Sequence, residues 1–283
     1  MQENEKMIVN RIEEKKYEIG INETIEINAA PNGDPMDYKE LNEMIHQAVN
    51  ANYKKIILHN VCGQRFIGAA LQGDIKIEID GVPGNDLGIF MDGPKIFVEG
   101  NCEDQSGNTM NDGTMIINGD GGDVIGLSSR GGKIYVKGDV GYRVGIHMKE
   151  YEDKFPVLII GGTAKDFLGE YMAGGIIIVL GLKFLSDGTI LENGRAVCGN
   201  ELGTGIHRGS IFLRTKEDLE EKLGVGAKIS DYGDKELSKI MPYLIDYCKT
   251  FNIPLDQVIN KPFKVIKPIS KRPFGGNYCN QLI

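Results

Sequence analysis

The stretch NGDGGDVIGLSSRGGKIYVKG, residues 118–138, is the most glycine-rich part of the chain, with seven glycines among 21 residues. Glycine of this density is typical either of a loop that cradles phosphate or of a corner repeated in a structural array. A dinucleotide-binding fingerprint needs G-x-G-x-x-G before a helix, but here Gly119 and Gly121 are followed by Val124 and then by a strand-like segment. The sequence also contains no G-x-x-x-x-G-K-[ST] motif. The stretch therefore favours a repeated corner over a nucleotide site.

A repeat runs through the middle of the chain. Glycines close successive segments at residues 81, 100, 119, 138, 162 and 181, with separations of 19, 19, 19, 24 and 19. An incomplete copy ends at residue 81 and a last one covers residues 198–215, which gives about seven units. Because a unit this short cannot bury a core alone, identical units must stack on one another.

Each unit ends in an alternating apolar pattern that predicts a β-strand with one face toward a core. The first inward position holds Ile96, Met115, Ile134, Leu158, Ile177 and Ile211, and the second holds Val98, Ile117, Val136, Ile160, Val179 and Leu213. One strand per stacked unit predicts a mainly β fold, a single-stranded parallel β-helix of about seven coils over residues 61–215.

The glycines are predicted to form the corners of the coils, several of which need a positive φ. They follow the pattern G-x-x-G-x-x-x-G at Gly81, Gly84, Gly88, Gly119, Gly122, Gly126, Gly138, Gly141 and Gly145, with a partial copy at Gly199 and Gly203. A polar column beside them holds Asn85, Asp104, Asp123, Asp166 and Asn200. Asn and Asp favour such turns by bonding their own backbone. The alternative is a carboxylate stack for a cation or for acid–base work on carbohydrates, which the interruption at Tyr142 disfavours.

The flanks read as two caps. Residues 1–60 are predicted to form an α/β cap, with a helix that starts at Asp37 and Glu40 and a strand over residues 54–61. Residues 216–283 are predicted to form a helical cap and an extended tail. This cap holds a short helix capped by residues 215–218 and a longer one over 234–251, kinked or restarted near Pro242.

The residue between the two inward positions faces outward, yet it is apolar in successive units. We call this set the outer stripe: Phe97, Ile116, Tyr135, Ile159, Ile178 and Phe212. An apolar stripe of this length is not left to water, so either the terminal helices cover it or it is a docking interface for another subunit or domain. A methionine column admits the same two interpretations, with core filling favoured: Met91, Met110, Met148 and Met172.

Bulk properties exclude several classes of function. A net charge of −8 and a pI near 5.2 argue against binding to nucleic acid or anionic lipid. The five cysteines form no C-x-x-C pair, and the first 20 residues lack the apolar segment of a signal peptide, so a reducing cytoplasm is expected. The four histidines, His46, His59, His147 and His207, do not have the spacing of metal ligands. We therefore predict no catalytic, cofactor-binding or metal-binding residue on this chain.

The glycine spacing, together with NVCGQRFIG at residues 60–68, resembles the glycine-repeat (GXGXG) C-terminal domain of the large (alpha) subunit of glutamate synthase, in its stand-alone archaeal-type form. The resemblance implies a right-handed β-helix that supports glutaminase (amidotransferase) and FMN/iron–sulfur synthase chains. These chains make glutamate from glutamine and 2-oxoglutarate. FMN, iron–sulfur clusters and a dependence on NADPH or ferredoxin are then expected on partner chains, because no N-terminal nucleophilic cysteine or cysteine cluster occurs here. Glu103 and Lys165 replace the middle glycine and residues 149–154 are inserted, which predicts local bulges.

Three alternatives stay open. The β-helix also resembles the C subunit of formylmethanofuran dehydrogenase, another scaffold of a multisubunit oxidoreductase. A free-standing carbohydrate-acting β-helix enzyme is favoured only if the acidic column lines a cleft. A self-associating structural protein would use the outer stripe.

Overall fold

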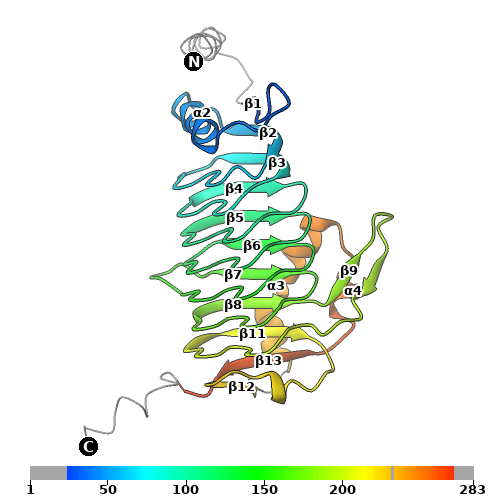
Figure 1. Cartoon of the computed structure of the whole chain (residues 1–283). Helices are drawn as coiled ribbons and strands as arrows, with labels where there is room; N and C mark the ends of the chain where they lie inside the picture. The colour runs from blue at the N-terminus through cyan, green and yellow to red at the C-terminus, as the bar shows by residue number, and fades with distance from the viewer. Residues whose placement is uncertain (1–23, 231–232, 271–283) are drawn as a thin grey trace, which may run out of the picture.

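The computed structural model describes residues 24–230 and 233–270, and its strands stack into one 11-stranded sheet along a rod (Figure 1). The sheet order is β1-β2-β3-β4-β5-β6-β7-β8-β11-β13-β12, and the neighbours from β1 to β11 are parallel. The parallel strands are β1 (Thr24–Asn28), β2 (Lys55–Cys62), β3 (Lys76–Val82), β4 (Asp92–Val98), β5 (Asp112–Ile117), β6 (Lys133–Val136), β7 (Val157–Ile160), β8 (Ala173–Val179) and β11 (Arg208–Arg214).

The parallel solenoid predicted from the repeat is confirmed. The strands β3 to β8 and β11 correspond to the seven predicted units, and together they bound about six turns, slightly fewer than the number of units. Register follows the predicted columns, since Met115 pairs with Ile96 on one side and with Ile134 on the other. All members of both inward columns are buried. The methionine column is also buried, so its core-filling interpretation is correct.

The half of each coil that carries no strand contains three left-handed positions. In the coil after β3 these are Asp86, Gly88 and Phe90, with φ of 60°, 65° and 59°. Only the middle position is regularly glycine, although a left-handed residue with a side chain costs about 1–2 kcal/mol. The amides at these positions donate alternately to the next and the previous coil, for example Asp86 N to Asp104 O and Gly88 N to Ile67 O, at 3.0 and 2.8 Å. These coil-to-coil bonds hold the strained backbone, which the sequence had indicated only for glycine, asparagine and aspartate positions.

The predicted corner glycines fall into two groups. Those with positive φ are Gly81, Gly88, Gly126, Gly145 and Gly203. The others leave room for the preceding coil: Gly84, Gly119, Gly122, Gly138, Gly141 and Gly199. A Cβ on Gly122, for example, would lie 2.9 Å from the backbone nitrogen of Asp104. This close approach, rather than an unusual φ, requires glycine in the second group.

The polar column forms a ladder between coils. Asp104 Oδ1 accepts a hydrogen bond from Asp123 N at 2.8 Å, and Asp123 Oδ1 accepts one from Tyr142 N at 2.9 Å. A parallel ladder three residues earlier runs from Asn101 through Asp120 and Asp139 to Thr163 N, with bonds of 2.8, 2.7 and 2.7 Å. These side chains therefore bond the backbone of the next coil, not their own as expected.

The ladders explain why some units carry a larger residue where the others have the middle glycine. Asp104 Oδ1 and Asp123 Oδ1 occupy the space where a Cβ on Gly122 or Gly141 would lie. At the equivalent position of the next coil stands Lys165. The residue beside it in the preceding coil is Tyr142, which has no carboxylate to occupy the space that the Lys165 Cβ needs. The expected bulge is absent there, since Lys165 N donates to Gly141 O at 3.1 Å just as Gly141 N donates to Gly122 O at 3.0 Å. Glu103 differs, because its amide donates to Pro83 O at 3.2 Å, one residue before the equivalent Gly84, so the register shifts locally there.

The N-terminal cap contains one predicted helix and one strand that was not predicted. Helix α2 (Tyr38–Asn50) begins after Asp37, whose side chain accepts from Lys39 N at 2.8 Å. Its buried residues, Leu41, Ile45 and Ala48, are those at the expected helical spacing. Strand β1 extends the sheet by pairing with β2, while residues 1–23 lie outside the described part of the chain.

The C-terminal part differs from a helical end cap. The rod ends in two antiparallel strands, β13 (Phe263–Pro268) and β12 (Ala227–Ser230), and η1 (Glu220–Lys222) replaces the expected short helix. Helix α3 (Asp234–Phe251) runs unbroken through Pro242, is followed by α4 (Leu255–Ile259), and lies along the side of the rod (Figure 1). The insertion near residues 182–197 forms a hairpin of β9 (Leu182–Phe184) and β10 (Ile190–Glu192). The tail beyond residue 270, with Cys279, lies outside the described residues.

Two adjacent glycines test the close-approach argument. We expect Gly122→Ala to lower the free energy of unfolding by about 2–4 kcal/mol, since its Cβ meets the backbone of the preceding coil. Gly121→Ala is the matched control, because the nearest atoms to its Cβ would be side-chain carbons of Ile125 and Val140, at 3.3 Å, and not backbone. Its cost should stay below about 1.5 kcal/mol. Urea unfolding followed by circular dichroism measures both, and equal losses would contradict the argument.

Candidate functional site

The outer stripe is covered by the chain's own C-terminal helix. Ile116, Tyr135, Ile159, Ile178 and Phe212 are at most 4% exposed, and Phe97 is partly buried against the same cluster. The cover consists of α3, with Ile240, Leu244, Tyr247 and Cys248 on its buried face, and of Val258 in α4. The stripe is therefore not available as the docking interface expected from sequence. Of the two interpretations, coverage by a terminal helix is the one the structure shows.

Polar contacts fix α3 on the sheet. Asp246 accepts hydrogen bonds from Tyr135 Oη at 2.9 Å and from Lys133 Nζ at 2.5 Å. Tyr247 Oη donates to Val136 O at 3.2 Å, and its ring meets that of Tyr135 edge to face at 5.6 Å. Burial opposes the ionisation of Asp246, but these two donors outweigh it and hold the pKa of the carboxyl below its ordinary value. Burial and the contact with Asp246 raise the pKa of Tyr135. The Tyr135 hydroxyl is thus a hydrogen-bond donor that orients α3.

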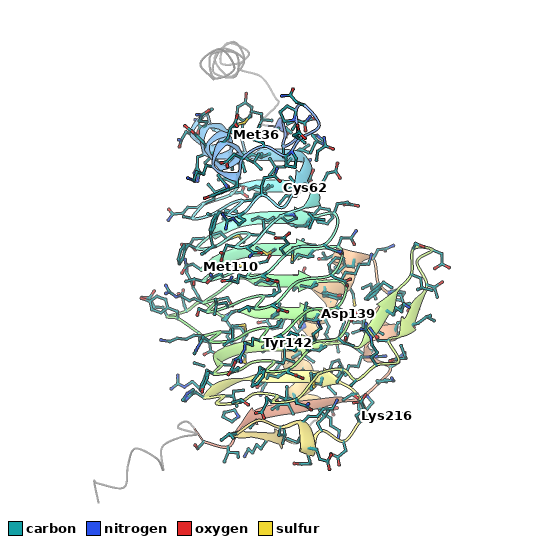
Figure 2. All side chains as sticks on the ribbon, viewed as in Figure 1. Met36, Cys62, Met110, Asp139, Tyr142 and Lys216 are labelled. Carbon is teal, nitrogen blue, oxygen red and sulfur yellow. The ribbon has the colours of Figure 1, made fainter. Side chains whose placement is uncertain are left out.

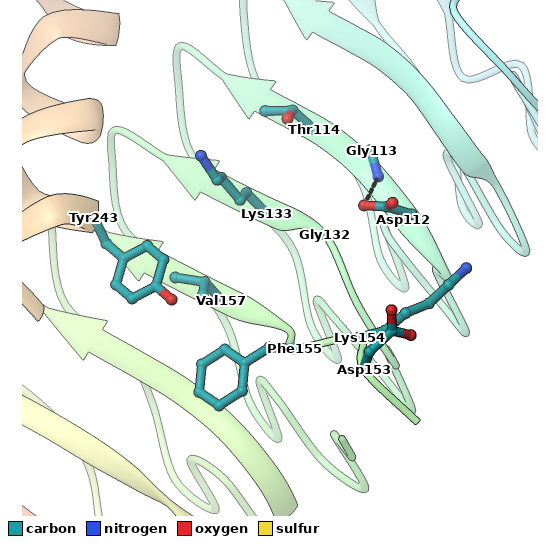
Figure 3. Close-up of a pocket in the computed structure, with 10 residues that line it drawn as sticks. All are labelled: Asp112, Gly113, Thr114, Gly132, Lys133, Asp153, Lys154, Phe155, Val157 and Tyr243. Atoms are coloured by element: carbon teal, nitrogen blue, oxygen red, sulfur yellow. Dashed lines mark hydrogen bonds between the residues drawn. The ribbon is translucent and has the colours of Figure 1, made fainter. Parts of the chain in front are cut away.

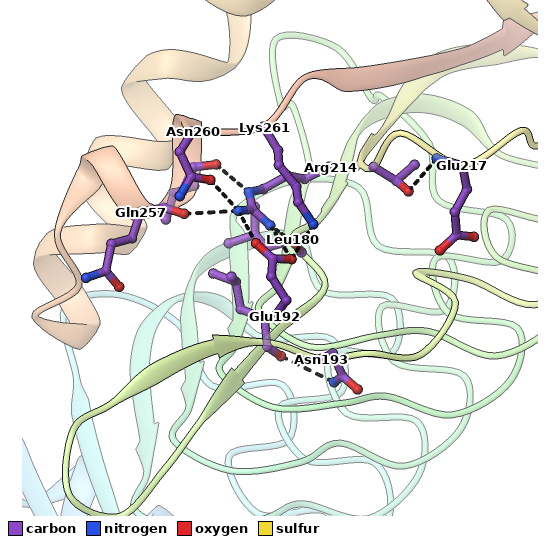
Figure 4. A network of polar contacts seen from close by, with 11 residues as sticks. Leu180, Glu192, Asn193, Arg214, Glu217, Gln257, Asn260 and Lys261 are labelled. Atoms are coloured by element: carbon purple, nitrogen blue, oxygen red, sulfur yellow. Dashed lines mark hydrogen bonds and ion pairs between the residues drawn. The ribbon is translucent and has the colours of Figure 1, made fainter.

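A buried arginine joins four segments of the chain. The Arg214 side chain is fully buried, with Nε donating to Val258 O at 2.8 Å and Nη1 to Leu180 O at 3.1 Å (Figure 4). Its Nη2 donates to Glu192 Oε1 at 2.7 Å, and Lys261 binds the other oxygen of that carboxylate at 2.6 Å. The Arg214 hydrogen bond is the main cause of the lowered pKa of Glu192. Arg214 thereby ties the β9–β10 hairpin and α4 to the end of β11.

The hairpin is held at a second point by one residue of the corner ladder. Asp139 lies on the side of the rod from which the hairpin projects (Figure 2). It accepts hydrogen bonds from Thr163 N at 2.7 Å and Asn193 Nδ2 at 3.1 Å, and it forms an ion pair with Arg195. Sequence reasoning missed both Asp139 and Arg214. The recurrence of Asp or Asn directly after the closing glycine, as in Gly119-Asp120 and Gly138-Asp139, could have indicated the first. No sequence signal distinguishes Arg214 from a surface arginine.

The inserted residues 149–154 form a loop with a hollow on each side. The first hollow has a volume of about 460 Å³ and lies between this loop and α3, with Phe155 on one wall and Tyr243 on another (Figure 3). Its two lysines are already neutralised, since Lys133 binds Asp246 and Lys154 binds Asp92 at 2.7 Å. The acidic column lines neither hollow, so neither of them supports a carbohydrate-acting site built on that column.

Two buried cysteines and two histidines of the described residues take part in packing or surface contacts. Burial raises the pKa of Cys102 to about 11 and that of Cys198 to about 12, so these thiols stay protonated. His59 contacts Glu26 at 3.2 Å, whereas the ring of His147 stacks on Tyr171 with centroids 5.4 Å apart. Within residues 24–230 and 233–270, no three His, Cys, Asp or Glu side chains form a group that could hold a metal ion. None of the helices described is long and apolar enough to cross a membrane.

These features define a parallel β-solenoid whose glycines and corner carboxylates are used to pack one coil on the next. The sequence profile of the GXGXG motif matches residues 38–269, most of the chain. The chain therefore belongs to the GXGXG motif family, the family of the glycine-repeat domain of the glutamate synthase alpha subunit. It is also similar to an uncharacterized protein of Methanocaldococcus jannaschii. The two are 56% identical over 254 residues, which cover 88% of this chain and 95% of the relative.

The contact between Asp246 and the sheet predicts a pH-dependent stability. A lowered pKa in the folded state means that the contribution of Asp246 is complete above its unfolded pKa of about 3.9 and is lost as the pH falls through the folded value. We expect Asp246→Asn to cost about 1 kcal/mol at neutral pH, after screening by solvent, and progressively less below about pH 4. Urea unfolding at a series of pH values measures the difference, with Tyr247→Phe as the control, because this hydroxyl donates to the carbonyl oxygen of Val136 and to no carboxylate. A constant difference for Asp246→Asn would contradict the assignment.

Removing the buried arginine should loosen the hairpin and α4 together. Arg214→Met leaves three carbonyl groups and Glu192 without their donor, and we expect a loss of about 3 kcal/mol in the free energy of unfolding. Thermal unfolding gives the size of the loss, and hydrogen exchange should show it concentrated in β9, β10 and α4. Arg195→Gln, at an exposed side chain of the same hairpin, is the control and should cost less than about 1 kcal/mol. Equal effects of the two changes would refute the proposed role of Arg214.

Proposed function

We propose that this chain is a scaffold subunit of a glutamate synthase-type complex. In this proposal the conversion of glutamine and 2-oxoglutarate to glutamate takes place on partner chains, a glutaminase and an FMN/iron–sulfur synthase. The chain itself supplies a rigid surface that positions them. Membership of the GXGXG motif family supports the connection with glutamate synthase.

The observation that carries the proposal is that the glycine-rich stretch, which first suggested a phosphate-binding loop, is engaged in packing one coil on the next. In the glycine-rich stretch, Gly122 makes room for the preceding coil, and Asp120 and Asp123 accept bonds from the following one. Gly126 has a left-handed φ of 72° at a turn. Side chains and glycines engaged in this way are not free to bind phosphate or to transfer protons. The repeat therefore supports a structural role.

The proposal assigns FMN, the iron–sulfur clusters and the NADPH- or ferredoxin-dependent electron supply to partner chains, and it places the complex in the cytoplasm. Because α3 covers the outer stripe, the partner chains must bind elsewhere on the rod. The loop of residues 149–154 and the β9–β10 hairpin both project from the regular coils (Figure 1), and each interrupts an otherwise even surface.

Reconstitution tests the proposal. The full chain is mixed with the glutaminase and FMN/iron–sulfur chains of the same source, and complex formation is followed by size-exclusion chromatography. We expect co-elution, and an increase of at least about tenfold in glutamine-dependent glutamate formation when the chain is added, since correct positioning of two active sites is worth this much. Flavin and iron are assayed in the chain alone, and we expect neither.

Two outcomes would contradict the proposal. Bound flavin or iron on the isolated chain would show that it carries chemistry of its own. Full glutamine-dependent activity of the partner chains without it would show that it is not their scaffold. Co-purification with a molybdenum or tungsten enzyme would favour the formylmethanofuran dehydrogenase alternative.

A further inference from the structure

The second hollow beside the inserted loop has the properties of an anion-binding site. It has a volume of about 560 Å³, within the usual range for small-ligand sites. Two columns of residues from three successive coils form it, and Tyr151 of the inserted loop adds a wall. The first column is Ser128, His147 and Tyr171, and the second, two residues further along each coil, is Arg130, Lys149 and Ala173.

The charge of this hollow is of one sign. Its lining contains the cationic side chains of Arg130 and Lys149 but no carboxylate, although the whole chain carries a net charge of −8. Within the described part of the chain, no carboxylate pairs with Arg130 or Lys149. By contrast, Lys133 and Lys154 in the neighbouring hollow are both in ion pairs. An arginine and a lysine side by side without a counter-charge leave donors available for an anion.

Ring contacts hold two of the lining side chains in place. The Arg130 guanidinium lies over the ring of Tyr151, 5.8 Å from its centroid, and the imidazole of His147 is nearly parallel to the ring of Tyr171, at 10°. Ala173 has a small side chain at the next step of the second column, which leaves space beside Lys149. Stacked groups of this kind lose less conformational freedom when they bind a ligand.

The repeat supplies an internal comparison. The equivalent positions of the second column in the two preceding coils are Asp92 and Asn111, so the coil architecture does not itself require a cation there. Left-handed backbone at the first column recurs in those coils, at Phe90 and Thr109, and is likewise a property of the architecture. In this column the cations are Lys149, at the start of the inserted loop, and Arg130, in the coil before it. The insertion and the charge therefore mark one local feature.

We propose that this hollow binds a small dianion whose phosphate or carboxylate oxygens accept hydrogen bonds from Arg130 and Lys149. The planar guanidinium group suits two oxygens of one phosphate or carboxylate, and the lysine supplies a point charge beside it. Ser128 and Tyr151 contribute hydroxyl groups at the rim. The proposal stands independently of any role in glutamate synthesis.

Isothermal titration of the full chain with sodium phosphate and, separately, with disodium succinate tests the site at about 0.1 M salt, where weak surface attraction is largely screened. We expect saturable binding of at least one anion, and a loss of at least about tenfold in affinity for Arg130→Gln/Lys149→Gln, since each change removes charge-assisted hydrogen bonds. The matched control is Lys216→Gln/Lys228→Gln, which removes the same charge at exposed positions elsewhere and should change the affinity less than about twofold.

The outcomes separate the sources of the anion. Binding of phosphate alone identifies a phosphate-bearing ligand, and binding of succinate alone identifies a dicarboxylate. Binding of both identifies a site that selects its ligand by negative charge only. Single variants Arg130→Gln and Lys149→Gln each should weaken binding, and circular dichroism checks that these exposed changes leave the fold intact. Failure of both anions to saturate, or an equal loss in the control pair, would overturn the proposal.

Discussion

The hydrogen bond from a backbone amide to an Asp or Asn side chain one coil earlier determines much of this structure. It requires the accepting side chain to lie against the following coil, and so it requires a glycine directly before the donating amide. Gly122 precedes Asp123, which donates to Asp104, and Gly141 precedes Tyr142, which donates to Asp123. The composition of the repeat thus follows from one contact made at successive coils. Where the preceding coil has no carboxylate at this position, as at Tyr142, the following coil can carry a residue with a side chain, here Lys165.

The departures from this regular contact form the parts of the molecule that differ from coil to coil. Asp139 is a ladder residue that also binds the hairpin, and Arg214 stands at the end of a regular strand and binds the hairpin and α4. The inserted loop brings Tyr151 beside Arg130 of the preceding coil. In each case an irregular segment is fixed by a residue of the regular frame. A rigid frame with a few fixed projections is well suited to hold other chains.

The sequence was sufficient for the frame because its signals are local and repeated. Alternation at Ile134 and Val136, multiplied over seven units, predicts strands and their register. The sequence was not sufficient to predict what covers Tyr135, since an outward apolar residue can pack against a helix of its own chain or against a partner chain. Which of the two covers it depends on where α3 packs, and the contact of Tyr135 with Asp246 joins residues 111 positions apart. The left-handed backbone at Val124 and Ser128 was also missed, because its stabilisation comes from neighbouring coils rather than from residue type.

The position of α3 also sets an order of events during synthesis on the ribosome. The coils from β2 to β4 rest on residues made before them or soon after, so they can form while the chain is still emerging. From β5 onward the outer face waits for residues 234–251, and β11 waits for β13 as its neighbour. During that interval the apolar face of the later coils is open to the cell. The nascent chain therefore exposes a long apolar surface, of the kind that chaperones recognise, until α3 has been made and has packed on the coils.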